Sequence, residues 1–333
     1  MTGPLPPNPP DVIAAAGALR AGGLVAFPTE TVYGLGADAS NVEAVRKVFA
    51  LKGRPANHPL IVHLRDAAQL DDWAADVPPA ARRLAAAFWP GPLTLVLPRA
   101  ARVPDAVTGG QDSVALRVPS HPVAGALLAA FGGGIAAPSA NRYGRVSATC
   151  AEHVREEFGE DAPLVLDGGD SDVGLESTIV SCLEDPPRLL RPGAITAAQL
   201  TAIAGGLAVG DAAGAPRTPG STRSHYAPRT PVSLVGSGEL EALVESALSA
   251  GQGVAVLARR PAGHVSARLL WIDAGMAPDA YAHALYANLR ALDKAGCDRL
   301  LVEAVPDGGA WDAVRDRLTR AAARDDVPAS DLP

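Results

Sequence analysis

Residues 27–36 of the chain read FPTETVYGLG, and they follow a short apolar run that predicts a strand over residues 24–27. If the backbone stays extended beyond that run, Thr29, Thr31 and Tyr33 point to one face, because side chains alternate along a strand. The proline inside the stretch argues against a regular strand. Two glycines then leave the backbone without side chains. The stretch therefore stops resembling a core strand, and its three hydroxyls require a purpose.

Strand and helix patterns alternate outward from this stretch. Some segments repeat apolar residues at helical spacing, whereas others are short apolar runs bounded by Gly and Pro. We expect helices over 11–20, 41–51, 78–88 and 148–158, and strands over 24–27, 60–64, 93–97, 114–118, 133–141, 163–166 and 177–182. Such alternation is typical of the α/β class, and the turn-rich spacing favours a mixed sheet over a purely parallel one.

The composition changes at residues 205–231, which are rich in Gly, Ala, Pro, Ser and Thr and predict a linker. A second α/β pattern follows, and its length of about 100 residues is enough for a small domain. Its expected elements are strands 232–235, 254–258, 269–272 and 299–303 and helices 238–250, 278–295 and 310–323. We therefore expect a flexible arm at 1–10, a first domain at 11–204, the linker at 205–231 and a second domain at 232–333.

The composition also excludes several classes of protein. The net charge of -7 at pH 7 argues against a chain whose main work is gripping a nucleic-acid backbone. Three widely spaced cysteines, Cys150, Cys182 and Cys297, form neither a disulfide framework nor a zinc pattern, which fits a reducing compartment. The sequence shows no secretory signal and no apolar run of ~18 residues. We therefore expect a cytoplasmic protein with no membrane association.

The main basic element is LKGRPANHPLIVH, residues 51–63. Lys52 and Arg54 lie at the end of a predicted helix that Gly and Pro break, and the break must orient them because they do not share a helical face. Together they form a cationic clamp for phosphates or, alternatively, complement the helix macrodipole. Asn57 lies in the following loop, where it serves a ligand or the turn itself. His63 ends an apolar strand, as a hydrogen-bonded structural residue, a ligand contact or a proton acceptor.

Arg117 lies inside an otherwise apolar strand, on the face that alternation also assigns to Ser113 and Ala115. An arginine beside apolar surface needs a partner or water. Either a carboxylate ligand or an exposed strand face therefore accounts for it.

Residues 137–147, APSANRYGRVS, carry Ser139, Asn141 and Ser147 directly after an apolar run. Short side chains that donate and accept hydrogen bonds suit a loop at the end of a strand, where α/β sheets bind ligands. A helix N-cap with a turn is the alternative. Residues 167–180, DGGDSDVGLESTIV, contain an acidic turn that either approaches a magnesium ion or is merely solvated.

The chain lacks the patterns GxxxxGK[ST], HExxH, GxSxG and CxxC, and it lacks GxGxxG between a strand and a helix. These absences exclude the familiar phosphate-binding and hydrolase devices, although not phosphate binding by other means. The candidate residues are hydroxyls, amides and a few cations, with no Ser-His-Asp set and no prominent carboxylate pair. This profile suits a reaction driven by positioning and charge stabilisation, as nucleotidyl transfer is.

Seven motifs occur in one order along the chain: FPTETVYGLG, KGRPANHPLIVH, FWPGPLTLVL, ALRVPSHP, APSAN, DGG…GLESTIV and RPGAI. In this order they closely resemble the YrdC-like domain of the threonylcarbamoyl-AMP synthases, from about residue 12 to 200. The segment TPGSTRSHYAP and the C-terminal unit look like the long, two-domain form of that family. The resemblance implies a YrdC-like twisted mixed sheet with flanking helices, followed by a smaller Rossmann-like α/β domain.

The resemblance also implies an activity. The family forms L-threonylcarbamoyl-AMP and pyrophosphate from L-threonine, bicarbonate or carbon dioxide, and ATP with Mg2+. A downstream transferase then moves the threonylcarbamoyl group to an adenosine of tRNA. Under this reading the chain needs no metal site of its own and no stable nucleic-acid binding.

Family roles carry over to matching positions of this sequence. Lys52 and Arg54 are the implied catalytic cations, and the 205–231 segment, with His225 and Tyr226, is the implied lid. The backbone beside Thr31 is expected to approach the substrate. The implied threonine contacts are Thr31, His63, Arg117 and Ser177. The implied ATP contacts are Lys52, Arg54, Asn57, Ser113, Ser139, Asn141, Ser147, Arg191 and Tyr226.

Two departures from the family pattern stand out. Ser181 follows STIV, where the family often has Asp, and the linker reads PGSTRSHYAP where PGMKYRHYAP is common. A double-stranded RNA-binding module of the same fold is one alternative function, against which the net charge weighs. A carbamoyltransferase or hydrogenase-maturation enzyme is another, but those carry zinc-finger segments whose cysteines are missing here.

Overall fold

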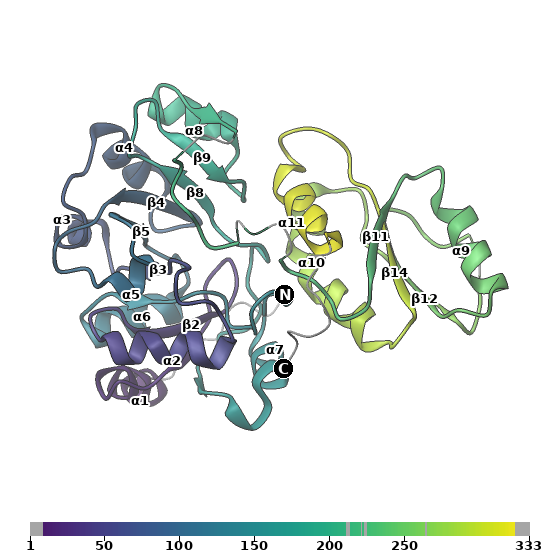
Figure 1. Ribbon diagram of the computed structural model, residues 1–333, viewed down its shortest axis with the longest axis horizontal. Helices are drawn as coiled ribbons and strands as arrows, with labels where there is room; N and C mark the ends of the chain where they lie inside the picture. The colour runs from purple at the N-terminus through teal and green to yellow at the C-terminus, as the bar shows by residue number, and fades with distance from the viewer. Residues whose placement is uncertain (1–8, 211–213, 221, 223–224, 264, 324–333) are drawn as a thin grey trace. The chain divides into compact units, whose positions relative to one another are not determined.

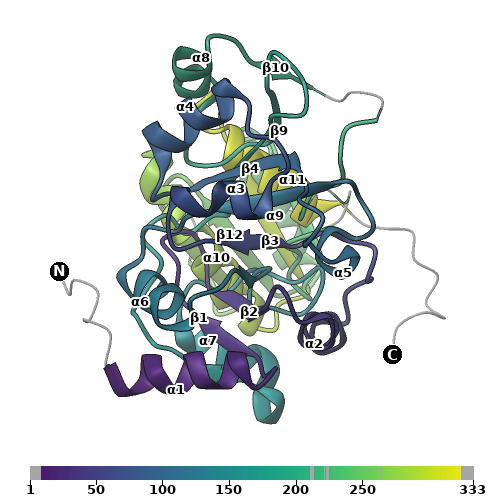
Figure 2. The same cartoon turned by 90° about the vertical axis from the view of Figure 1, so that its left-hand side faces the viewer.

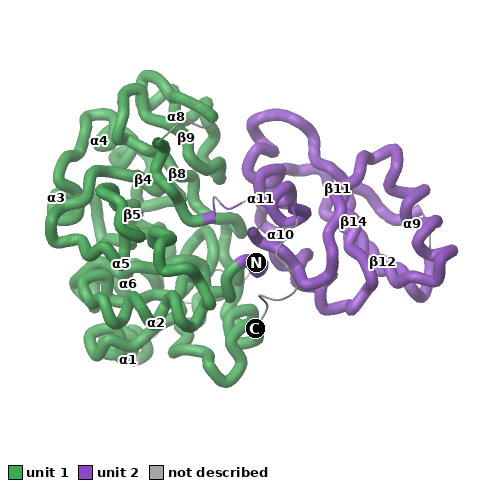
Figure 3. The backbone as a smooth tube through the Cα atoms, viewed as in Figure 1, with its two compact units in different colours: residues 1–143, 147–219 green, residues 144–146, 220–333 purple. Residues whose placement is uncertain are grey.

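The computed structural model describes residues 9–210, 214–220, 222, 225–263 and 265–323. The chain divides into two compact units, one of Met1–Tyr143 with Ser147–Pro219 and one of Gly144–Val146 with Gly220–Pro333 (Figure 3). The main division thus falls inside the segment predicted as a linker. Helix α1 begins at Pro9, within the predicted arm, whose first eight residues lie outside the described part. Among the described helices, none is both long and apolar enough to cross a lipid bilayer.

The first unit is built on a mixed sheet. Its described strands follow the order β10-β9-β8-β4-β5-β3-β6-β2-β1-β7 (Figures 1 and 2). Parallel pairs such as β3 with β5 occur beside antiparallel pairs such as β4 with β5, which confirms the predicted mixed sheet. The strands are β1 Val25–Phe27, β2 Gly34–Asp38, β3 Ile61–His63, β4 Leu93–Pro98, β5 Ser113–Arg117, β6 Ile135–Ala136, β7 Leu164–Val165, β8 Thr178–Ser181, β9 Arg188–Arg191 and β10 Ala208–Val209.

Helices flank this sheet, and local signals set the ends of α2. Asn41 accepts the N–H groups of Glu43 and Ala44, which caps the first turn. Gly53 ends the helix at a φ of +62°, a conformation that glycine adopts without strain. The helices are α1 Pro9–Arg20, α2 Val42–Lys52, α3 Leu70–Trp73, α4 Pro79–Phe88, α5 Asp105–Thr108, α6 Pro122–Phe131, α7 Ala151–Phe158 and α8 Ala197–Ala204, with 3-10 turns at Ala67–Gln69 and Gly159–Asp161.

The core of the first unit lies between these helices and the sheet. Leu19 of α1 and Leu127 of α6 share one apolar cluster with Phe27 of β1 and Ile135 of β6. A second cluster joins α2 and α7 to β2, and a larger one joins α4 and α8 to the strands around β4. Helices therefore pack on both faces of the sheet at β1, whereas around β4 the helices of this cluster pack on one face.

The stretch at 28–33 is a connection between antiparallel strands, and the extended row of hydroxyls does not form. Strand β1 ends at Phe27 and pairs there with Gly34, the first residue of β2. Thr29 Oγ1 accepts the Val32 N–H at 3.2 Å and donates to the Val32 carbonyl at 2.6 Å, which closes a turn. The Tyr33 hydroxyl instead donates to the Gly169 carbonyl at 2.7 Å. Hydrogen bonds from side chains to the backbone therefore hold this stretch in a turn, and it does not form an extended strand.

Gly36 has a packing role. A Cβ built at this position would lie 2.8 Å from both Ile135 Cγ2 and Phe27 Cε1, so only glycine lets these core side chains close over β2. This packing does not address the backbone beside Thr31, whose approach to a substrate stays a prediction.

The second unit, described by itself, has an all-parallel sheet in the order β11-β14-β12-β13. Helices connect β11 to β12 and β13 to β14, which confirms the Rossmann-like prediction, whereas no helix is described between β12 and β13. One apolar face of its longest helix is buried, including Tyr281, Leu285, Leu289 and Leu292. The elements are β11 Val232–Val235, α9 Leu240–Ser249, β12 Val254–Ala258, β13 Leu269–Asp273, α10 Pro278–Lys294, β14 Arg299–Glu303 and α11 Asp312–Ala322.

Candidate active site

One end of the large sheet gathers the four residues predicted to contact threonine. His63 and Arg117 are the last residues of the parallel strands β3 and β5, and they pair in register. Thr31 reaches the same end, because its Oγ1 accepts a hydrogen bond from Arg117 Nη1 at 2.7 Å. Ser177 directly precedes β8, whose first residue pairs with the first residue of β4. Since β4 runs antiparallel to β5, its start lies at the end of β5.

Arg117 is buried and held from three directions. Its Nε donates to the Gly91 carbonyl at 3.3 Å, and its Nη1 donates to Thr31. Its Nη2 lies 2.7 Å from a carboxylate oxygen of Glu30. The alternative of an exposed strand face is therefore wrong. A buried arginine needs a partner, and Glu30 supplies at least part of it, although the sequence analysis did not select this acid.

His63 is 3% exposed, and no group in the described part of the chain bonds its Nδ1. Burial, together with the neighbouring Arg117 charge, lowers the pKa of His63 to about 3. The imidazole is therefore neutral at pH 7, and so low a pKa makes it a poor general base. The unbonded Nδ1 favours a ligand contact over a purely structural role, because buried polar atoms normally have partners.

Ser177 and Arg191 are bonded to each other. Arg191 Nη2 donates to the Ser177 carbonyl at 2.8 Å and to its Oγ at 3.2 Å. Ser177 Oγ also shares a hydrogen bond with Thr94 Oγ1 at 2.7 Å. Arg191 Nη1 donates to the Pro219 carbonyl at 2.8 Å. The Arg191 guanidinium thus holds both Ser177, which precedes β8, and Pro219, the last residue of the first unit.

Lys52 joins helix α2 to the Ser139–Asn141 segment. Its buried Nζ donates to the Ser139 carbonyl at 2.6 Å and to the Asn141 carbonyl. Burial, and then the charge of Arg54, holds the pKa of Lys52 well below its usual range, against the opposite effect of Glu157 and Glu176. Lys52, of the Lys52–Arg54 motif, and the Ser139–Asn141 motif lie far apart in the sequence and therefore meet only in the folded chain.

Arg54 is also buried, and its Nη2 donates to the Pro59 carbonyl at 3.0 Å. Its guanidinium lies 6.0 Å from the centre of the Tyr143 ring. Gly53 turns the chain between the two cations. Both side chains donate to carbonyls outside α2, so other segments of the chain hold them in place.

Two buried acids belong to the site although sequence reasoning missed them as site residues. Glu30 pairs with Arg117, and Glu176 accepts a hydrogen bond from Ser147 Oγ at 2.5 Å. Each acid stands one position before a predicted threonine contact, Thr31 or Ser177. That adjacency is the signal that could have found them.

Four further predicted ATP contacts occupy different positions in the structure. Asn57 is exposed, and Ser139 is half-buried. Ser113 begins β5, four residues from Arg117, which places it about 13 Å away along the strand. Tyr226 belongs to the second unit, where it is buried at a φ of +60° and stacks on Tyr286. Their roles stay predictions.

Ser181, where the family often has Asp, ends β8 four residues after Ser177. It is buried, and its Oγ accepts the Leu183 N–H at 3.4 Å. A distance of about 13 Å along the strand separates it from the threonine end of the sheet.

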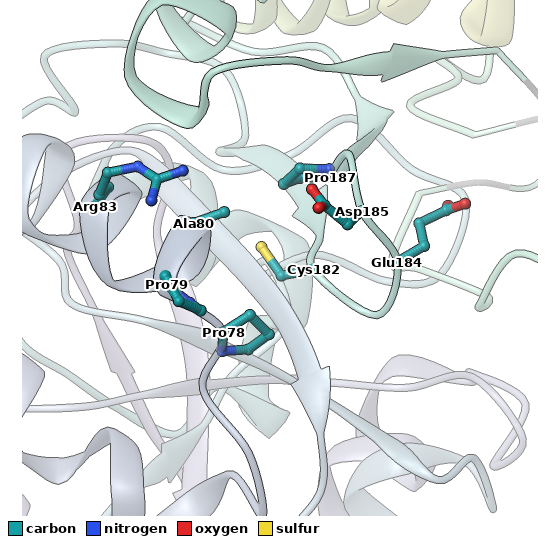
Figure 4. Close-up of a pocket in the computed structure, with 8 residues that line it drawn as sticks. All are labelled: Pro78, Pro79, Ala80, Arg83, Cys182, Glu184, Asp185 and Pro187. Carbon is teal, nitrogen blue, oxygen red and sulfur yellow. The ribbon is translucent and has the colours of Figure 1, made fainter.

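A pocket of about 250 Å³ lies elsewhere in the first unit (Figure 4). It is lined by Pro78, Pro79, Ala80, Arg83, Cys182, Glu184, Asp185 and Pro187, none of which is a predicted site residue. Burial raises the pKa of the Cys182 thiol to about 12, which leaves it protonated at neutral pH. This pocket adds no catalytic group.

Comparison with known proteins gives a consistent result over both units. The Sua5–YciO–YrdC family model, described as "Telomere recombination", matches residues 17–193, and the model of the threonylcarbamoyl-AMP synthase C-terminal domain matches residues 195–323. The chain is 42% identical to a threonylcarbamoyl-AMP synthase of Bacillus subtilis, over 97% of this chain and 96% of that protein. A Pyrococcus abyssi threonylcarbamoyl-AMP synthase is 40% identical over 92% of both chains.

Solved structures resemble the whole chain as well. The crystal structure of P. abyssi Sua5 complexed with L-threonine has a TM-score of 0.88 and 38% sequence identity, and the match covers 95% of each chain. The E. coli YciO structure, at 24% identity and a TM-score of 0.51, shares only the fold of the first unit's region, over 58% of this chain.

Proposed function

Because the chain belongs to the family of threonylcarbamoyl-AMP synthases, in its long Sua5 form, we propose that it joins L-threonine, bicarbonate or carbon dioxide, and ATP into L-threonylcarbamoyl-AMP, with release of pyrophosphate. The observation that carries this function is the threonine end of the sheet, where Thr31, His63 and Arg117 converge. The similar P. abyssi structure holds L-threonine. Neither alternative function has an observation in its favour.

The threonine subsite has a group for each part of the amino acid. Arg117 supplies planar donors for the α-carboxylate. Thr31 and Ser177 supply hydroxyls for the substrate's hydroxyl or amine. His63 is neutral and its Nδ1 has no partner among the described residues, so it orients the amine by a hydrogen bond.

The nucleotide subsite follows from the two cations. Lys52 has three N–H donors, and two of them already bond the carbonyls of Ser139 and Asn141. The third N–H of Lys52 would donate to a phosphate oxygen, with Arg54 beside it. Binding a polyanion favours the charged ammonium, which opposes the low pKa that burial imposes.

Magnesium enters this proposal with ATP. Among the described residues, no group of three or more His, Cys, Asp or Glu side chains could hold a metal ion. Such a group is not required for Mg2+, because proteins often bind this ion through one or two carboxylates together with substrate phosphates and waters. The buried Glu176 carboxylate is the candidate ligand, because its charge acts on Lys52 of the proposed nucleotide subsite. When bound, the ion would offset negative charge on the phosphates.

The chemistry then needs positioning more than reactive side chains. The neutral amine of threonine attacks carbon dioxide, loses a proton and becomes a carbamate. A carbamate oxygen attacks the α-phosphorus of ATP, and the bond from that phosphorus to pyrophosphate breaks. Lys52 and Arg54 stabilise the charge that builds on the phosphates.

Further parts of the proposal concern the cell and the lid. We place the enzyme in the cytoplasm, where a downstream transferase passes the threonylcarbamoyl group to tRNA. The 205–231 segment acts as the lid that protects the easily hydrolysed product. Residues 211–213, 221 and 223–224 of that segment lie outside the described part of the chain.

Exchange of labelled pyrophosphate into ATP tests this function. Exchange is expected only when threonine and bicarbonate are both present, because the carbamate is the nucleophile. Exchange that proceeds without threonine would refute the proposal. Parallel detection of threonylcarbamoyl-AMP by mass spectrometry identifies the product directly.

A further inference from the structure

Glu30 is the part of the threonine end that the proposed function leaves unexplained. It stands between Thr29 and Thr31 and is 4% exposed. One carboxylate oxygen lies 2.7 Å from Arg117 Nη2, and the other accepts the Ser120 N–H at 3.1 Å. A buried acid therefore faces the same guanidinium that the proposed function assigns to the carboxylate of the substrate.

Stability alone does not account for this ion pair. Removing two charges from water costs about as much as their attraction returns, and an apolar pair of similar volume is often as stable. The pair does provide orientation. Together with the bonds from Arg117 to Gly91 and Thr31, it holds the guanidinium plane by contacts to two other segments of the chain.

The segment that carries Glu30 is itself fixed. The Glu30 carbonyl accepts the Val173 N–H at 2.7 Å, and Thr29 closes the turn through Val32. Thr29 Oγ1 also lies 2.8 Å from Thr31 Oγ1. Glu30 therefore cannot move away from Arg117 without moving Thr31, so the two contacts on the guanidinium are coupled.

We propose that Glu30 is a positioning residue of the threonine subsite, which fixes the Arg117 guanidinium and limits how strongly it attracts the α-carboxylate of the substrate. This inference rests on the proposed function. Because Glu30 neutralises Arg117 before the substrate arrives, the carboxylate is selected mainly by the direction of the remaining N–H groups. Weak ground-state attraction also serves catalysis, since interactions that bind substrate and transition state equally do not raise kcat.

The Glu30→Gln variant tests this role, because it keeps the volume and an acceptor for the Ser120 N–H but removes the charge. Calorimetry on the full chain without ATP compares L-threonine with L-threoninamide, in which a neutral amide replaces the carboxylate. In this variant the carboxylate of threonine takes the place of Glu30 as counter-charge of Arg117. For Glu30→Gln we expect the Kd for L-threonine to fall about tenfold, while the Kd for L-threoninamide does not fall. The ratio of the two Kd values therefore rises about tenfold.

A matched control removes the same charge elsewhere. Glu43 lies on α2 with a side chain that is 73% exposed, and Glu43→Gln is expected to leave the ratio unchanged. Weakening of both ligands by one factor in Glu30→Gln would indicate a merely structural role and overturn the proposal. An unchanged ratio in folded Glu30→Gln would overturn it as well.

The Glu30→Asp variant keeps the proposal testable if Glu30→Gln does not fold. Aspartate retains the charge but is one methylene too short to hold both Arg117 and Ser120. We expect a ratio within about twofold of wild type and a kcat for threonine-dependent exchange at least about tenfold lower. An unchanged kcat would refute the positioning role. Wild-type protein that binds neither ligand would instead refute the proposed function, so the two failures are distinguishable.

Discussion

Replacing Thr31 with valine removes one hydroxyl and keeps the shape of the side chain. Thr31 is fully buried, and its Oγ1 accepts the hydrogen bond from Arg117 Nη1 at 2.7 Å. The variant thus deprives a buried guanidinium of one acceptor, and hydrogen bonds to charged groups contribute about 1.5–3 kcal/mol each. For a unit of this size, about 2–4 °C per kcal/mol predicts a Tm lower by about 3–12 °C.

The same hydroxyl is proposed to contact the substrate, so activity should respond separately from stability. Loss of one such bond, at about 1.4 kcal/mol per factor of ten, lowers kcat/KM for threonine at least about tenfold and leaves the KM for ATP unchanged. The assays are thermal unfolding of the ligand-free chain and threonine-dependent pyrophosphate exchange. Thr201→Val is the control, because the Thr201 hydroxyl bonds only a helical carbonyl at an exposed position.

Two results would refute this reasoning about Thr31. A Tm within about 1 °C of wild type would mean that Arg117 does not depend on the hydroxyl. An unchanged kcat/KM for threonine, or a KM for ATP that rises as much as the KM for threonine, would mean that Thr31 supports the fold and does not face threonine.

The other predictions concern the clamp and the buried histidine. Arg54→Ala should lose nearly all exchange activity and Arg54→Lys should restore little, because lysine lacks the planar fork; near-normal turnover of either variant would remove Arg54 from the clamp. His63 binds a proton at about pH 6.5 when unfolded but only at about pH 3 when folded, so the stability it contributes is complete above pH 6.5 and is lost as the pH falls toward 3. Urea unfolding between pH 7.5 and 4.5 should show His63→Asn losing about 1.4 kcal/mol less per pH unit than wild type below pH 6.5, and equal slopes would contradict the burial-driven pKa.

The sequence predicts the strands whose residues prefer extended backbone and misses those that tertiary pairing creates. The apolar runs of β4, β5, β12 and β14 were all expected, and they form. Strand β2 reads GLGAD, a composition that disfavours strands, and it forms because it pairs with β1 and β6 on its two sides. The run predicted over 133–141 is shortened to Ile135–Ala136, because Pro138 has no N–H for the ladder, although its carbonyl still accepts the Leu35 N–H at 2.8 Å and Ser139 bridges Gly34.

The site was predictable to the extent that its residues lie in recognisable motifs. The pairing of Lys52 with the Ser139–Asn141 segment, and of Thr31 with Arg117, joins motifs that the resemblance had grouped. The partner of Arg117 was not predictable by the same means. Glu30 is 87 positions away, and no local pattern states which of several acids a buried arginine will face.

The buried cations of the site share one arrangement, and it bears on how the site works. Lys52 donates to the carbonyls of residues 139 and 141, Arg54 to that of residue 59, Arg191 to those of residues 177 and 219, and Arg117 to Gly91 as well as to Thr31. Each cation is therefore oriented by neutral oxygens before any anion arrives. Donors that are fixed during folding need little reorganisation when charge develops, which is the condition for electrostatic stabilisation of a transition state. Arg117 is in addition paired with the acid Glu30, so Glu30 adjusts the charge of this guanidinium as well as its direction.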